Sequence, residues 1–320
     1  METASSRPTS ASIDFERLFA ALMEPGALLN DEDVEALIVL KSDGRRQLRT
    51  ALSGLDAGAR FGVLARLIDL AEAQVRFDAG SVCLDCLQDP DASVRALAAN
   101  GLREVEGREA LIRLQQLAAD DPDELVRAEA IGALRPWVLR AEFGQLRPDD
   151  RSALIAVLRE LAEDGGVEAA LRGSAVESLG ALSEEWVREL IHESFAAEDQ
   201  RLRLGALRAM GWSADPYWLP TVLDATAALD DEERAAAAFA AGEIEDEDAV
   251  PSLRDLLEDE SVDVVLAAVA ALGEIVSPLA LEALAAASTH PEAEVRDAAR
   301  AVSERTAILA DPLGVTGMQY

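Results

Sequence analysis

The chain has 320 residues, is 50% hydrophobic but only 4% aromatic, and carries a formal net charge of -32, with 61 acidic against 29 basic residues. This apolar content is enough for a folded core, and its Ala, Leu and Val favour close-packed helices over sheets. A surface with this much negative charge repels phosphate backbones and anionic lipids. We therefore expect neither a nucleic acid nor a membrane as partner. Solubility, or a salty cytoplasm, explains the acidity more simply than a dedicated basic partner.

The N-terminal stretch METASSRPTSAS has no basic segment followed by an apolar one, so no signal peptide is expected. The longest apolar run, residues 264–272, is less than half the roughly 20 residues that cross a bilayer. The two cysteines, spaced as CLDC, make a disulfide scaffold implausible. These features predict a cytoplasmic protein.

The first part of the chain is expected to form a disordered tail (1–11) and a helical cap (12–88). IDFERLFAALM predicts one amphipathic helix, and DEDVEALIVLK with RRQLRTALSGL predicts a hairpin. LDAGARFGVLARLIDLAE, followed by FDAGSVCLDCLQD, suggests a divergent repeat. Cys83 and Cys86 fall on its core positions, and a structural zinc site would need two further ligands, so packing is favoured over metal or redox roles.

Residues 89–306 contain a repeat, seen by aligning DPDASVRALAANGL with DPDELVRAEAIGAL and five later segments. One position, called here the key position, falls at Arg95, Arg127, Arg172, Arg203, Arg234, Val265 and Arg296, and four of its six steps are 31 residues. Ala stands three residues later every time, and Gly stands eight residues later in four units. A second apolar ladder follows after each polar turn, and Pro220 and Pro251 lie near its start.

Each unit therefore predicts a helical hairpin whose first helix carries the key position. Such hairpins bury their apolar faces only by stacking, which predicts a curved solenoid with the second helices on its concave surface. An acid stands four residues before every Arg of the key position, as at Asp91 and Arg95, and where Val265 replaces Arg the acid is replaced by Ser261. This pairing predicts a structural i, i+4 ion pair in preference to a ligand-binding arginine.

The step of 45 residues between Arg127 and Arg172 predicts an insertion around 136–149, where Pro136 should end the first helix. Trp137 and Phe143 in this insertion either bind a partner as exposed side chains or fold back to form a small core of the insertion. The second interpretation is slightly favoured. A C-terminal tail is expected at 307–320.

The stretch GWSADPYWLP places Trp212, Tyr217 and Trp218 at an inter-helix turn. Aromatic residues in such a turn are either binding anchors or plugs between hairpins, and plugging is slightly favoured. The remaining predicted protein-binding residues, placed on the expected concave surface, are Arg188, His192, Asp224, Arg254 and Asp255. That surface is mixed and inclines to acidic, unlike the basic groove that a DNA-binding enzyme needs.

The aligned segments, best shown by DEDAVPSLRDLLEDESVDVVLAAVAALGEI, resemble the HEAT-repeat family, in particular its short phycobilin-lyase type, over about residues 89–305. The resemblance implies an all-α, right-handed α-α superhelix. Seven registered units with no complete catalytic constellation predict a non-enzymatic scaffold or adaptor, without a cofactor, that binds another protein through its concave surface. Electrostatics favours a partner with basic segments.

Two other functions stay open. One is an accessory subunit of a phycobilin-lyase-like cofactor-attachment system. The weaker one is a metal enzyme, since His192–Glu193 is similar to one of the paired His-Glu motifs of deoxyhypusine hydroxylase, which needs several. The sequence contains no P-loop, GxGxxG or GxSxG motif.

Overall fold

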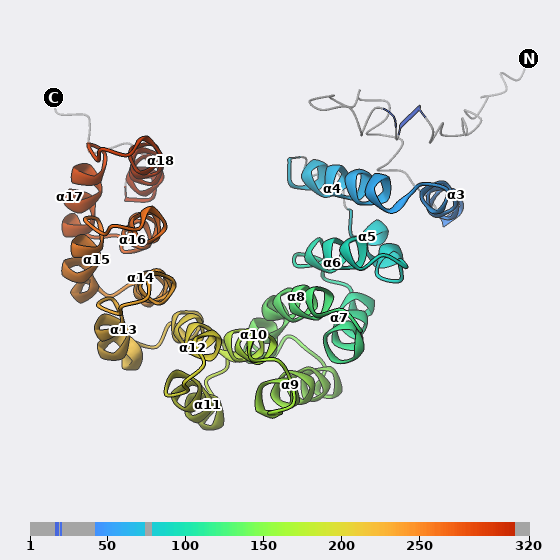
Figure 1. The fold of residues 1–320 in the computed structure, drawn as a ribbon, viewed down its shortest axis with the longest axis horizontal. Coiled ribbons are helices and arrows are strands. Elements are labelled where there is room, and N and C mark those ends of the chain that lie inside the picture. Colours follow the sequence, from blue (N-terminus) through green and yellow to red (C-terminus); the bar gives the residue numbers. More distant parts are fainter. Residues whose placement is uncertain (1–16, 19, 21–41, 74–78, 311–320) are drawn as a thin grey trace, which may run out of the picture. The chain divides into compact units, whose positions relative to one another are not determined.

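The structure, a computed structural model, describes residues 17, 18, 20, 42–73 and 79–310 (Figure 1). All regular elements in these ranges are helices, which confirms the all-α class. The predicted tail at 1–11, the helix at DEDVEALIVLK and residues 311–320 lie outside them, as does most of IDFERLFAALM. The chain clusters into two compact units, unit 1 (Met1–Ala133) and unit 2 (Leu134–Tyr320). The predicted division into cap, solenoid and tail stays a prediction.

Unit 1 holds the helices before the boundary and the start of α8. Their bounds are α3 (Ser42–Ser53), α4 (Ala57–Ala73), α5 (Gly80–Cys86), α6 (Ala92–Asn100) and α7 (Arg108–Asp120), followed by α8 (Glu124–Glu142). α6 packs on both α4 and α5. Cys83 of α5 is fully buried there, as expected for a packing residue.

Unit 2 continues with hairpins of about the predicted length. Its helices are α9 (Pro148–Glu163), α10 (Ala169–Leu179), α11 (Glu185–Phe195), α12 (Gln200–Ser213), η1 (Pro216–Trp218), α13 (Leu219–Ala225), α14 (Asp231–Ile244), η2 (Glu247–Ala249), α15 (Val250–Leu256), α16 (Val262–Glu274), α17 (Pro278–Ala287) and α18 (Ala293–Ala310). Proline occupies the first turn of α9, α13, α15 and α17, where its missing N–H costs nothing.

These helices form two rows. The first helices α10, α12, α14, α16 and α18 pack on one another in chain order, and we call them the inner row. The second helices α9, α11, α13, α15 and α17 form the outer row, and Figure 1 shows the inner row on the inside of the bend of unit 2. The core lies between the rows, where Ala206, Leu207 and Met210 of α12 and Val222 of α13 are fully buried.

Glycine and alanine bring the inner-row backbones close together. A Cβ added at Gly205 of α12 would lie 2.3 Å from the carbonyl oxygen of Gly173 of α10, and one added at Gly180 would lie 2.5 Å from that of Ala209. Closely spaced helices on one side make a stack bend toward that side. The expectation that second helices line the concave surface is therefore wrong for unit 2, where the small residues lie in the first helices and make the inner row the shorter one.

The arginines of the key position bind differently from the predicted i, i+4 pairs. Arg95 forms a two-bond ion pair, at 2.9 Å, with Asp121 in the turn before the next first helix, and Arg234 does the same with Asp259 at 2.7 Å. The aspartates four residues earlier cap their helices instead, as Asp91 does by accepting hydrogen bonds from two N–H groups of α6, whereas Glu168 makes no side-chain cap bond. The contacts are structural, but they differ from the predicted pairs: Arg95, Arg203 and Arg234 tie one repeat to the next, while Arg127, Arg172 and Arg296 bond backbone carbonyl groups.

Burial and bonding set the charge states of these turn acids. Hydrogen bonds from Arg234 hold the pKa of Asp259 below its usual range, against burial and with help from the Ser261 N–H group. Burial opposes the same lowering at Asp121, but hydrogen bonds from Arg95 and from the Asp123 N–H group outweigh it and leave the pKa lowered. The side chain of Asp259 is only 10% exposed, so its ion pair with Arg234 contributes more to stability than an ion pair at the surface does.

The extra residues after Arg127 lengthen α8 instead of forming a loop from Pro136. α8 continues through Pro136 to Glu142, which corrects the predicted helix end. A proline inside a helix costs about 3 kcal/mol. Burial of Trp137 and Val138 in the following turn stabilises the helix by roughly 1.5–3 kcal/mol for each side chain, which offsets that cost.

Candidate functional site

Two columns of residues on the inner row point away from the outer row. With 100° of rotation per residue, positions five and nine after the key position lie opposite positions three, four and seven, which face the core. These two columns define the inner face: Glu177, Arg208, Phe239, Ala270 and Ala301 at position five, and Trp212, Glu243, Glu274 and Arg305 at position nine. Arg208, Ala270, Glu274, Ala301 and Arg305 are exposed.

Trp212 is the centre of an ordered cluster on this face. The guanidinium of Arg135, from α8, lies 4.2 Å from the centroid of the Trp212 ring and is paired with Glu177 of α10. The Trp212 Nε1–H group donates to Glu177 Oε1 at 3.3 Å, and Arg208 lies 3.8 Å from the other carboxylate oxygen. Phe239 of α14 packs against Trp212 with 5.2 Å between the ring centroids. One carboxylate, two guanidinium groups and two rings thus hold one another in place.

Glu243 follows Phe239 by one helical turn on α14 and is half-buried. Among the described residues, neither a hydrogen bond nor an ion pair reaches its carboxylate. Burial raises its pKa, and the nearby charges of Glu274 and Glu245 raise it further, while Arg135 lowers it. Glu274 is paired with Arg305 at 2.7 Å, with both side chains about half exposed. The inner face therefore carries a carboxylate that is costly to ionise and that no cation from the described residues binds.

Sequence reasoning found Trp212 but missed Arg135, Glu177, Arg208, Phe239 and Glu243. The repeat alignment contained the necessary pattern, because the inner face comprises the positions half a helical turn away from the invariant Ala. Our sequence prediction placed the concave surface on the second helices, and so it did not use this pattern. Arg135 lies outside the two columns and could not have been found from them.

Tyr217 and Trp218 belong to a different part of unit 2 from Trp212. Both lie in η1 at the start of the outer-row segment, and Trp218 is 2% exposed, so it fills the space between hairpins. His192 of α11 packs against Trp218, with 4.6 Å between ring centroids, and its Nε2 lies 2.9 Å from the Tyr217 hydroxyl. Tyr217 is 54% exposed. The structure thus does not unite the three aromatic residues of GWSADPYWLP.

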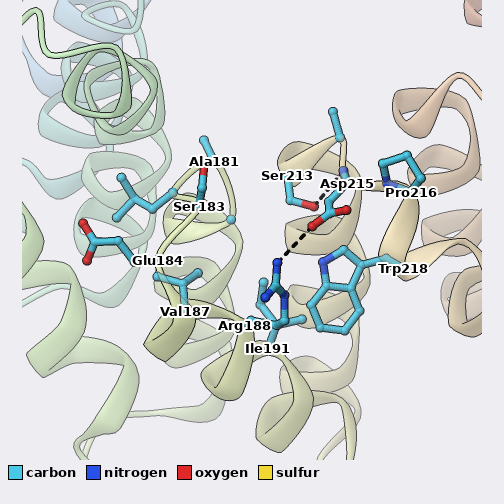
Figure 2. Close-up of a pocket in the computed structure, with 13 residues that line it drawn as sticks. Ala181, Ser183, Glu184, Val187, Arg188, Ile191, Ser213, Asp215, Pro216 and Trp218 are labelled. Atoms are coloured by element: carbon cyan, nitrogen blue, oxygen red, sulfur yellow. Dashed lines mark hydrogen bonds and ion pairs between the residues drawn. The ribbon is translucent and has the colours of Figure 1, made fainter.

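A pocket of about 320 Å³ lies between the turn after α10 and the turn after α12 (Figure 2). Figure 2 shows Arg188 of α11 pointing toward Asp215, beside the Trp218 ring, with Ser183 and Glu184 across the pocket. Arg188 bonds Asp215 at 3.2 Å and Glu185 at 3.0 Å, so its charge is used within the protein. Asp215 also caps η1 by accepting from the Tyr217 N–H group. These contacts give the turn a structural role.

The other predicted binding residues are dispersed. Trp137 is buried, while Phe143, at the end of the lengthened α8, is 68% exposed. Asp224 of α13 and Arg254 and Asp255 of α15 are exposed, and all three lie on outer-row helices. None of these residues contacts the Trp212 cluster through a hydrogen bond, an ion pair or ring stacking in the described part of the chain.

Unit 1 offers a cavity of about 550 Å³ lined by α3 and α5 residues that include Arg49, Asp85 and Cys86. Burial raises the pKa of the Cys86 thiol to about 12, and the charges of Asp89 and Asp85 add to this effect. The thiol is therefore protonated at neutral pH and is a poor nucleophile or metal ligand. The described ranges contain no group of three or more His, Cys, Asp or Glu side chains arranged to hold a metal ion.

None of the described helices combines the length and the apolar character needed to cross a membrane. A comparison of the sequence with curated proteins gave no match. The solved structures that resemble this fold include human deoxyhypusine hydroxylase in complex with glycerol (20% identity, 83% of this chain and 98% of that one, TM-score 0.37). They also include YibA of Escherichia coli, which is 15% identical over 93% of this chain and 100% of that one, with a TM-score of 0.42. Yeast importin-beta, Kap95p, is 15% identical over 94% of this chain and 47% of that one, with a TM-score of 0.48. At these identities the likenesses say nothing about function.

The family model described as HEAT repeats matches residues 63–135 and 219–303. The first match begins in α4 and so includes the divergent repeat, and the second covers the hairpins from α13 to α18. Helical hairpins with a 31-residue period, packed in register through small residues, agree with this match. The chain therefore belongs to the HEAT-repeat family.

Proposed function

We propose that this chain is a non-enzymatic HEAT-repeat scaffold that binds another protein through the inner face of unit 2. The observation that carries the proposal is the Trp212 cluster: a tryptophan, a phenylalanine and two arginines held on rigid helices at the surface. Trp and Arg are the side chains that most often dominate binding energy at protein interfaces. Their internal contacts pre-order them, so little side-chain entropy remains to be lost on binding.

Charge supports a protein partner over a nucleic acid. The net charge of -32 repels phosphate, and Glu243 and Glu274 place acidic groups beside the aromatic pair. A HEAT solenoid presents a long row of equivalent positions, which suits an extended polypeptide. The alternative of a phycobilin-lyase-like accessory subunit, the short-repeat subtype and the cytoplasmic location remain predictions from the sequence.

Site-specific photo-cross-linking tests this proposal. A photoreactive phenylalanine derivative would replace exposed Ala270 of α16 on the inner face or, as a matched control, exposed Ala285 of α17 on the outer row. Both positions are alanines in the same hairpin, so the two proteins differ only in the face that carries the probe. We expect irradiation of the native lysate to yield a discrete protein adduct from position 270 and not from position 285.

The adduct should also disappear when Trp212→Ala is introduced in the same chain. Equal adducts from both positions, or an adduct that is indifferent to Trp212, would show that the inner face is not the binding surface. A visible chromophore bound to the purified protein would instead favour the cofactor-attachment alternative.

A further inference from the structure

We propose that Phe239 and Glu243 form a seat for one arginine of the partner, within an extended basic segment. This inference rests on the proposed function and specifies the chemistry of the partner. The two side chains are four residues apart on α14, so they lie on the same face of the helix. A half-buried aromatic ring thus lies one helical turn from a half-buried carboxylate on the inner row.

The protein already contains a satisfied version of such a seat. Arg135 stacks on Trp212 at 4.2 Å while its guanidinium pairs with Glu177. Phe239, which packs on Trp212, and Glu243 supply the same two components, a ring and a carboxylate, but no guanidinium of the residues that the structure describes joins them. A guanidinium from another chain that stacked on Phe239 and bonded Glu243 would complete the second set.

Charge and chemistry favour arginine as the occupant. A half-buried carboxylate close to Glu274 and Glu245 is costly to keep ionised, and an incoming cation would remove that cost. Arginine combines a planar group that stacks on rings with a fork of donors that matches a carboxylate, whereas lysine offers only a point charge. Arginine should therefore bind here more tightly than lysine.

The repeat then sets the spacing of the basic residues. Packed helices lie about 8–10 Å apart, and an extended chain advances roughly 3.3 Å per residue. Glu274, one repeat after Glu243, should thus meet a second basic residue about three positions along the bound segment. Glu274 is now paired with Arg305, and because both side chains are about half exposed this ion pair contributes little free energy. An arginine of the bound protein can therefore replace Arg305 at a small cost in free energy.

The probe for this seat is a fluorescein-labelled octapeptide with two arginines three residues apart in a Gly-Ser background. Its binding to the full chain would be measured by fluorescence anisotropy at low ionic strength. We expect Glu243→Gln to weaken binding at least about 5-fold, because one ion pair to a half-buried carboxylate is lost. The control, Glu258→Gln, removes the same charge at an exposed position in the turn before α16 and should weaken binding less than about 2-fold.

Two variants of Phe239 separate stacking from packing. Phe239→Leu keeps apolar contact with Trp212 but removes the ring, and should weaken binding about 3-fold or more, whereas Phe239→Tyr should retain it. Exchange of both peptide arginines for lysine should also weaken binding. Circular dichroism would show that each variant keeps its helical content.

Equal losses for Glu243→Gln and Glu258→Gln would overturn the proposal, because they would mean that only the net charge attracts the peptide. Absence of peptide binding to the wild type would overturn it as well. Either result would leave the scaffold function standing if position 270 still cross-linked to a partner. Failure of that cross-link, by contrast, would remove the inner face as the binding surface altogether.

Discussion

Trp212 and Trp218 are six residues apart, yet they serve opposite rows of unit 2. Trp212, on the inner row, is half-buried, stacks under Arg135 and packs against Phe239. Trp218, at the start of the outer-row segment, is 2% exposed and packs between His192 and Tyr217. The same residue type is thus a surface feature in one row and a core residue in the other. Position within the repeat, rather than residue type, decides which.

The two rows also differ in what holds them together. The inner row depends on glycine and alanine, which let backbones nearly touch, and on arginine ties between successive turns. The outer-row helices α13, α15 and α17 carry proline in their first turn and rest on the inner row through apolar side chains. The polar and aromatic groups of the inner face add contacts between successive first helices to this backbone packing.

The largest expected effect is the loss of Trp218. Trp218→Ala should lower the free energy of unfolding by about 3–5 kcal/mol, because it empties a large buried site. Trp212→Ala should cost only about 1 kcal/mol, since its ring is partly solvated, but should abolish the cross-link from position 270. Urea titration followed by far-ultraviolet circular dichroism measures both. Equal destabilisation by the two variants would break the distinction between the rows.

A methyl group in the inner row should be nearly as damaging. Gly205→Ala places a Cβ 2.3 Å from the backbone of Gly173, which no side-chain movement can relieve, and we expect a loss of about 3 kcal/mol. Gly165→Ala is the matched control, because a Cβ there meets nothing within 4 Å and should change stability by less than about 0.5 kcal/mol. If Gly205→Ala unfolds at the wild-type urea midpoint, the inner row is not closely packed.

The all-helical repeat was predictable because small and charged residues recur in the sequence with the period of the hairpins. The Ala and Gly positions recur every 31 residues, and stacking alone explains why. The direction of the bend was not predicted, since it depends on which row packs more closely, a comparison between helices far apart in sequence. The predicted helix end at Pro136 was wrong for a similar reason. The free-energy cost of a proline inside a helix is visible in the local sequence, whereas the burial of Trp137 and Val138 that offsets it depends on tertiary packing.

The candidate site was harder to predict than the fold. Its cluster joins Arg135, Glu177 and Trp212 from three first helices, and no short motif connects them. The tight group of aromatic residues at 212–218 suggested one site, but a helix end divides it between two rows. Clustering in sequence is thus a poor guide wherever a turn lies inside the cluster.

The arginine ties should contribute an intermediate amount. Asp259→Asn should cost about 2 kcal/mol, because it leaves the buried side of Arg234 without its charged partner. Asp297→Asn is the control, since its pair with Arg300 is 3.8 Å long and both side chains are mostly exposed, and it should cost less than about 0.5 kcal/mol. Similar losses for the two variants would mean that the ties are ordinary surface pairs.

The pH dependence of stability offers a second measurement of these ties. The folded state lowers the pKa of Asp259 and of Asp121, so their contribution is present above the unfolded value of about 3.9 and is lost as pH falls below it. Urea midpoints should therefore hold between pH 7 and 5 and decline below about pH 4. Asp259→Asn should reduce part of that decline, and an unchanged slope would contradict the assignment.

The smallest expected effect has the opposite sign, and it distinguishes the inner face from the scaffold beneath it. The pKa of Glu243 is raised, so its ionised form is disfavoured in the folded state, and the cost persists at every pH above the folded value. Glu243→Gln should therefore stabilise the protein at pH 7, by no more than about 0.5 kcal/mol given its partial exposure. The gain should shrink as the pH falls and vanish well below the unfolded pKa of about 4.3, where the carboxyl is protonated in both states. Glu258→Gln, in an exposed turn, controls for the change in net charge.

A stabilised Glu243→Gln variant that binds the arginine peptide less well would show that the chain keeps this carboxylate at the expense of stability, as binding sites commonly do. A destabilised one would make Glu243 part of the scaffold, and the seat would then lose its main support.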